Sequence, residues 1–163
     1  MQAAGPVPVV AMAAMPFPGL HGSMTSASDW SLHPRLEEDT AAVGDLPLSR
    51  LLVARDANYP WLLLVPRRPA VSEIIDLVDA DQAQLFAEIA QASRALKAIA
   101  PCDKLNVAAL GNVVPQLHVH VIARRTGDAA WPKPVWGAAP PKAYAPDELG
   151  RLIATLRRVL PLA

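Results

Sequence analysis

The sequence predicts an α+β domain in which an antiparallel sheet of about five strands carries one long packing helix and is followed by a C-terminal helix. Three observations predict this class. Short runs rich in aliphatic residues are separated by turn residues, as in strands. One long stretch, 82–99, carries an apolar stripe with helical spacing. A second helical stretch follows a proline-rich segment near the C-terminus.

The composition narrows the possible function classes. At 163 residues, the length suits one domain with a substantial core. The formal net charge is zero, which argues against a nucleic-acid-binding surface. No stretch approaches the ~20 apolar residues that a membrane span needs. The single cysteine, Cys102, cannot form an internal disulfide and indicates a reducing compartment, so we expect a cytoplasmic protein.

Residues 1–28 differ from the rest of the chain. They are rich in proline, alanine, glycine and methionine, and no charge precedes Asp29. Prolines interrupt any apolar region of the kind that a secretory signal requires. We interpret 1–28 as a disordered tail, or as an artefact of an upstream start with Met24 as a rival initiator. We expect the main domain at 29–137, and a proline-rich linker with the C-terminal helix at 138–163.

The first half of the main domain reads as a short helix followed by a hairpin. Asp29 or Ser31 is expected to cap the helix, which extends to about Thr40. A turn at 44–47 precedes strands at 48–54 and 61–65, which we expect to pair antiparallel. The second strand is unbroken in its apolar character, which predicts a central strand that is buried on both faces and covered by a helix.

The second half begins with a short helical turn at 72–77 and the long helix 82–99, capped by Asp79 or Asp81. Strands are expected at 105–110 and 116–122, and a final helix from Pro146 to about Leu160. The apolar stripe that should pack the long helix on the sheet consists of Leu85, Phe86, Ile89, Ala92 and Leu96.

The strand 116–122 is the most informative stretch. Polar and apolar residues alternate in it, so Gln116, His118 and His120 share one face. The intervening residues, Leu117, Val119 and Val121, face the other way and read as core. From a rise of ~3.3 Å per residue, successive members of the polar row are about 7 Å apart.

This strand resembles the signature strand of the histidine-triad family of nucleotide hydrolases and transferases. The family pattern is His-x-His-x-His followed by apolar residues, and here Gln116 stands at the first histidine. A second match, 61–69, resembles the central strand that leads to the family's long helix. The resemblance covers about residues 30–137. It implies a HIT-like fold and a homodimer whose sheets are joined across a two-fold axis.

The resemblance also implies a reaction. His118, at the middle position, would form a covalent nucleotidyl-imidazole that water or another acceptor resolves, on substrates such as dinucleoside polyphosphates or nucleoside phosphoramidates. Neutral imidazole is a competent nucleophile if its other nitrogen is held as N–H, commonly by a backbone carbonyl. His120 would hold phosphate oxygens or protonate the leaving group. No metal or other cofactor is required.

Gln116 differs from the histidine of the family pattern, and this difference affects how the leaving group would be stabilised. The family residue can be cationic, whereas an amide donates only a neutral hydrogen bond. Charge-assisted hydrogen bonds contribute about 1.5–3 kcal/mol and neutral ones about 0.5–1.5 kcal/mol. We therefore expect the replacement to cost on the order of tenfold in rate.

Four further residues are candidates for substrate binding. Asn112 matches a family position that contacts phosphate or leaving group, although a turn Asn explains it as well. Asp56 resembles the family's ribose-binding acid, with a plain turn Asp as the alternative. Asn106 and Arg124 complete the set, and Arg124 also reads as ordinary surface charge.

Two positions carry weaker expectations. Trp61 stands where the family often has another histidine, and we expect it to pack beneath the base. His33 precedes a proline on a polar segment and reads as a surface residue.

Two other functions stay open. His-x-His on a strand also offers two imidazoles to zinc, but a third ligand is needed and the sequence nominates none near them. Alternatively, the chain is a nucleotide-binding sensor that keeps the pocket with little turnover. Metal analysis separates the first of these from the nucleotidyl reaction, and tight binding without hydrolysis selects the second.

Overall fold

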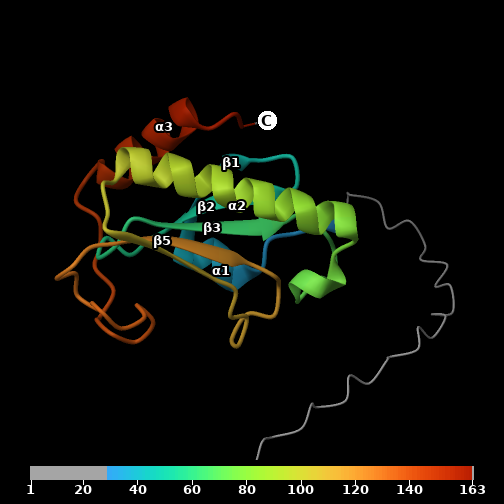
Figure 1. Cartoon of the computed structure of the whole chain (residues 1–163), viewed down its shortest axis with the longest axis horizontal. Coiled ribbons are helices and arrows are strands. Elements are labelled where there is room, and N and C mark those ends of the chain that lie inside the picture. The colour runs from blue at the N-terminus through green and yellow to red at the C-terminus, as the bar shows by residue number, and fades with distance from the viewer. Residues whose placement is uncertain (1–28, 163) are drawn as a thin grey trace, which may run out of the picture.

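The computed structural model describes residues 29–162, so the expectations for 1–28 lie outside the described residues. All five strands form one antiparallel sheet in the order β1-β2-β3-β5-β4, which confirms the predicted class (Figure 1). The strands are β1 (Thr40–Asp45), β2 (Ser49–Ala54), β3 (Trp61–Pro66), β4 (Lys104–Ala108) and β5 (Val119–Arg124). The helices are α1 (Pro34–Asp39), the 3-10 turn η2 (Ile74–Asp76), α2 (Asp79–Ile99) and α3 (Glu148–Val159).

The hairpin β2–β3 forms as the sequence predicts, and β3 is the central strand of the sheet. Leu62 to Val65 are buried on both faces, because α2 covers one side and α1 lies on the other. The unbroken apolar run of β3 is therefore explained by its central position in the sheet.

The face covered by α2 holds one continuous core. In Figure 1, α2 crosses the sheet, and α3 lies beside it over the same face. α3 contributes Leu156, and Leu160 follows it into the same core. Other members of this core on α2 and β5 are Leu85, Ile89, Ala92, Leu96, Val119, Val121 and Ala123.

Two residues of α2 differ from the predicted stripe. Phe86 is exposed, so its inclusion in the stripe was wrong. Glu88 is fully buried instead, and its carboxylate accepts from the backbone N–H groups of Leu48 (2.7 Å) and Ser49 (3.0 Å). These bonds join α2 to the start of β2 and satisfy two backbone donors in the interior.

The opposite face is covered in two separate patches. Near one end, α1 packs Leu36 against β2 and β3 together with Val114. Near the other end, the loop after β5 packs Ala130 and Val135 against Tyr59 and Ile122. The histidine pair lies on this divided face.

Several boundaries differ from the prediction. β1 was assigned to the end of a helix and a turn, because its sequence TAAVGD has no aromatic residue and only two β-branched ones, Thr40 and Val43. The ring of His33, rather than Asp29 or Ser31, caps α1 by accepting from the N–H of Arg35 (3.1 Å). Asp79 and Asp81 lie in the first turn of α2 and do not cap it.

β5 also begins later than predicted, at Val119, so Gln116 and His118 precede it in extended chain. Among residues 29–162, no helix combines the length and apolar character that a bilayer crossing requires.

Candidate functional site

The alternation along β5 is confirmed. Val119 and Val121 enter the core beneath α2, whereas His120 and Ile122 face the other side of the sheet. The rings of His118 and His120 lie 4.9 Å apart, centroid to centroid, at 82°. They lean together, which explains why this separation is smaller than the about 7 Å expected from strand rise. Only 7% of His118 and 6% of His120 is exposed.

The orientation of His118 is fixed by its own strand. Its Nδ1 lies 2.7 Å from the backbone carbonyl oxygen of Gln116. A carbonyl oxygen only accepts, so Nδ1 carries the proton and Nε2 keeps its lone pair. The arrangement provides what a nucleophilic imidazole requires: one nitrogen held and the other free to attack.

His120 has the opposite tautomer. The indole N–H of Trp61 donates to its Nδ1 at 2.9 Å, and an indole nitrogen only donates. Neutral His120 therefore carries its proton on Nε2. Burial, with His118 acting in the same direction, lowers the pKa of His120 to about 3. His120 is thus a neutral hydrogen-bond donor near pH 7, suited to holding an oxygen rather than delivering a proton.

Aromatic rings enclose His120. Trp61 lies 5.4 Å from it and Trp136 lies 5.2 Å from it, both edge-to-face, and the two indoles contact each other at 5.7 Å. Trp136 comes from the loop after β5, so two segments far apart in sequence form this wall. Such an environment removes water and disfavours a charged imidazole.

The side chain of Gln116 does not stand free beside the histidines, as the sequence suggested. Its Oε1 accepts from the backbone N–H of His33, and its Nε2 donates to the carbonyl of Ser31, each at 2.9 Å. The amide therefore holds the segment that leads into α1. The backbone carbonyl of Gln116, and not its side chain, contacts His118.

Arg124 is also placed differently from either expectation. It is only 2% exposed, and its guanidinium donates twice to Asp128, at 2.7 and 2.9 Å. It also donates to Oδ1 of Asn106 at 2.7 Å, and it lies over Tyr59. The hydrogen bond from Arg124 lowers the pKa of Asp128 to about 2. Arg124 and Asp128 therefore form a buried ion pair that supports the loop after β5, and Asn106 accepts a further hydrogen bond from Arg124.

The two remaining candidates lie in turns. Asp56 accepts through Oδ1 from the N–H groups of Asn58 and Lys142, each at 3.0 Å, so it joins the β2–β3 connection to the segment before α3. Asn112 is exposed in the turn before Gln116. Beside this turn, a recess of about 10 Å³ reaches His118.

The sequence interpretation missed the roles of Trp61 and Trp136. Trp61 pairs with Ile122, so strand alternation places it on the same face as His120. That signal needed only the register between two strands, which a single sequence does not supply. Trp136 lies in a proline-rich loop, where no periodicity indicates direction.

Metal ligation was also weighed. Within residues 29–162, no three side chains among His, Cys, Asp and Glu come together as a potential metal site. The zinc alternative therefore lacks a third protein ligand in that part of the chain.

Comparison with known proteins places this geometry in context. A model of the HIT domain matches residues 35–127. Proteins named AP-4-A phosphorylase from two strains of Mycobacterium tuberculosis are 32% identical over 119 residues, which is 67% of this chain and 60% of each relative. The chain therefore spans about 60% of the length of these curated relatives.

Solved structures agree with this assignment. A histidine triad protein from Bradyrhizobium japonicum is 67% identical and superposes with a TM-score of 0.78 over 80% of this chain and 97% of that protein. A histidine triad protein from Sinorhizobium meliloti is 39% identical, with a TM-score of 0.80 over 83% of this chain and 100% of that protein.

Proposed function

The chain belongs to the HIT domain family, and we propose that it is a nucleotidyl hydrolase or transferase acting through a covalent intermediate on His118. The observation that carries this proposal is the hydrogen bond between Nδ1 of His118 and the carbonyl of Gln116, because it leaves Nε2 as the nucleophile. The substrates we propose are dinucleoside polyphosphates or nucleoside phosphoramidates. The name of the mycobacterial relatives, AP-4-A phosphorylase, favours the first class.

The reaction has two balanced steps. Nε2 of His118 attacks the nucleotide phosphorus, a P–N bond forms, and the bond to the leaving group breaks with its electron pair. The ring becomes cationic, and the Gln116 carbonyl stabilises that charge through Nδ1–H. Water or phosphate then attacks the same phosphorus, and the P–N bond breaks with its electron pair returning to Nε2. The proton of the attacking group passes to solvent, neutral His118 is regenerated and the nucleotide is released.

His120 supports both steps as a donor. Its Nε2–H is available to a non-bridging phosphate oxygen, where negative charge concentrates during the displacement. Trp61 keeps this proton on Nε2 because it occupies Nδ1. We propose that Asn112 and Asp56 contribute to substrate binding, with Asp56 offering its Oδ2 to a ribose.

Trapping of the intermediate tests the proposal. Purified protein is mixed with a substrate panel labelled in the transferred nucleotide, quenched within milliseconds and digested for mass spectrometry. The expected adduct is a nucleotidyl group on the peptide that contains His118, absent from His118→Ala. Turnover by His118→Ala at the wild-type rate would overturn the mechanism.

A nucleotide-binding sensor is the second candidate, and one observation favours it. The side chain of Gln116 is bound to the backbone of His33 and Ser31 and is not presented beside His118, so the row lacks one of its three side chains. A sensor binds nucleotide tightly with negligible hydrolysis. Calorimetric binding beside the turnover assay separates the two functions.

We further propose a cytoplasmic homodimer. β4 is an edge strand, and Val107, Leu110 and Val113 expose large apolar side chains on it or just after it. Edges of this kind pair readily with another strand. The dimer is expected in light scattering after gel filtration, and Val107→Lys should shift it to monomer. A free Cys102 agrees with a reducing compartment.

A further inference from the structure

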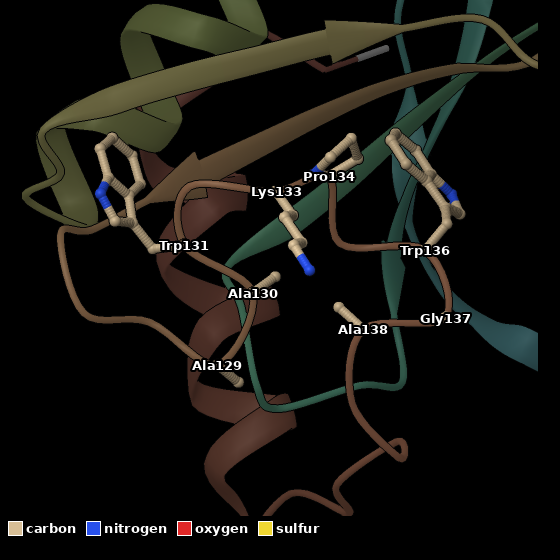
Figure 2. Close-up of a pocket in the computed structure, with 8 residues that line it drawn as sticks. All are labelled: Ala129, Ala130, Trp131, Lys133, Pro134, Trp136, Gly137 and Ala138. Carbon is tan, nitrogen blue, oxygen red and sulfur yellow. The ribbon is translucent and has the colours of Figure 1, made fainter.

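A cavity of about 600 Å³ lies within the loop that follows β5, and the reaction proposed above does not use it. Figure 2 shows its lining: Ala129, Ala130, Trp131, Lys133, Pro134, Trp136, Gly137 and Ala138. Its volume is in the range of small-molecule sites in proteins. Trp136 belongs both to this lining and to the wall around His120, with ring centroids 5.2 Å apart. The same indole therefore contacts both the cavity and one member of the histidine pair.

The loop that forms the cavity is held in place. Asp128 pairs with the buried Arg124 and also accepts from the N–H of Ala130 at 3.0 Å. Ala130 and Val135 are buried against Ile122 on β5. These contacts fix the loop at both ends of the Lys133 turn, so the cavity is preorganised and little ordering is needed when a ligand binds.

The lining has one charged side chain. Lys133 points into the interior of the loop in Figure 2, and no carboxylate lines the cavity. Within residues 29–162, the ion pairs involve other cations and not Lys133. Lys133 is exposed, and an ammonium group that lines a hollow without an acidic partner favours an anionic ligand.

The indole of Trp136 adds a second recognition element. It is 38% exposed even though its edge contacts His120 and Trp61. A partly exposed indole is a platform for planar bases, and stacking of this kind tolerates any base. A cation and an indole that line the same cavity, with the indole also in contact with His120, match an oligophosphate that carries a base.

We propose that this cavity is the subsite for the departing arm of the substrate, a nucleoside oligophosphate whose phosphates bind Lys133 and whose base stacks on Trp136. The inference rests on the proposed function, since it names the group that leaves His118. It predicts selectivity toward dinucleoside polyphosphates over nucleoside phosphoramidates, because the small amine leaving groups of the latter would not reach Lys133.

The test compares the affinities of ATP and AMP by calorimetry in a chelator-containing buffer, and it needs no turnover. AMP lacks the additional phosphates that would reach Lys133, so the ATP-to-AMP affinity ratio reports the subsite. We expect wild type to prefer ATP and Lys133→Gln to lower that preference about tenfold. The matched control is Lys97→Gln, which removes an exposed cation from α2 on the opposite face of the sheet.

Stacking is tested with a second pair of variants. Trp136→Leu should weaken ATP binding about tenfold, and Trp136→Phe should restore most of it because an aromatic face returns. Circular dichroism of all variants confirms that they are folded.

The outcomes separate the subsite from the reaction. An unchanged ATP-to-AMP ratio in Lys133→Gln, or an equal change in Lys97→Gln, overturns the subsite even if His118-dependent turnover is found. A ratio that falls only in Lys133→Gln supports the subsite even if no substrate is turned over, and in that case the proposed reaction fails alone. If wild type does not prefer ATP over AMP, the subsite is also overturned.

Discussion

The two faces of the sheet are built differently, although β5 supplies alternate residues to both. Beneath α2, Val119 and Val121 join one continuous core. On the other face, His118 and His120 lie between two smaller apolar patches, one under α1 and one under the loop after β5. Neighbouring residues of β5 therefore serve different purposes. The valines pack in the core that stabilises the fold, and the histidines face the candidate site on the other side of the sheet.

The largest expected effect comes from a substitution on the face of the sheet that carries the histidines, which leaves the core intact. His118→Ala should lower kcat/KM by at least about 10⁴-fold, as expected on loss of a covalent nucleophile, with a stability loss of about 1 kcal/mol or less. Val119→Ala, its neighbour, should cost about 2 kcal/mol of unfolding free energy and leave kcat within a few-fold. Steady-state kinetics and urea unfolding of both variants test whether the first change affects mainly activity and the second mainly stability. Similar effects of the two changes on both measurements would contradict it.

The next effect concerns the polar exception on the α2 face. Glu88→Ala leaves the buried N–H groups of Leu48 and Ser49 without partners, so we expect a loss of about 3 kcal/mol. Glu88→Gln keeps one acceptor oxygen and should lose about half as much. Urea midpoints at 25 °C measure both losses. Stability equal to wild type in Glu88→Ala would show that these backbone groups find other partners.

A pH series sharpens the contrast between a buried imidazole and an ordinary one. Because the folded-state pKa of His120 is lowered to about 3 from 6.5, the unfolded chain binds a proton between these values that the folded chain does not. The free energy of unfolding should therefore fall as the pH drops below 6.5, by up to about 1.4 kcal/mol per pH unit from this group.

His120→Asn is the matched variant for this series, since its amide oxygen still accepts from Trp61 but does not titrate. Urea unfolding at pH 7, 6 and 5 compares the two proteins. Parallel pH profiles would mean that His120 binds its proton as readily in the folded state as in the unfolded chain.

The smallest effect isolates one hydrogen bond on the site face. Trp61→Phe keeps an aromatic ring beside His120 and deletes the N–H that occupies Nδ1. We expect kcat to fall about tenfold, equivalent to about 1.4 kcal/mol, and the pKa of His120 to rise. ¹⁵N chemical shifts of the imidazole report the tautomer directly. An Nε2–H tautomer that persists unchanged in Trp61→Phe would show that the indole does not determine it.

Sequence patterns predicted those features that depend on local periodicity. The two faces of β5 follow from its period of two, and the central place of β3 follows from its unbroken apolar run. β1 was missed because alanine and glycine carry little strand signal. Phe86 was placed in the core because it lies only one position from a buried residue of the same stripe.

The candidate site was less predictable, because its decisive contacts join distant segments. Trp61 and His120 are 59 positions apart, and Gln116 and Ser31 are 85 apart. The partner of Arg124, Asp128, is visible at i+4, but the burial of that pair depends on Tyr59 and on how the following loop folds back. The sequence therefore indicates which side chains carry polar or charged groups, but it does not indicate which residues they contact.

Gln116 has a consequence for any attempt to place three histidines at positions 116, 118 and 120. A carboxamide presents its acceptor and donor side by side, so it pairs with the backbone of residues 31 and 33 as a neighbouring strand would. The nitrogens of an imidazole diverge and cannot repeat that pairing. A histidine at position 116 would add a third ring but would remove both hydrogen bonds to the chain that enters α1. Gln116→His should therefore require a compensating change near residues 31–33.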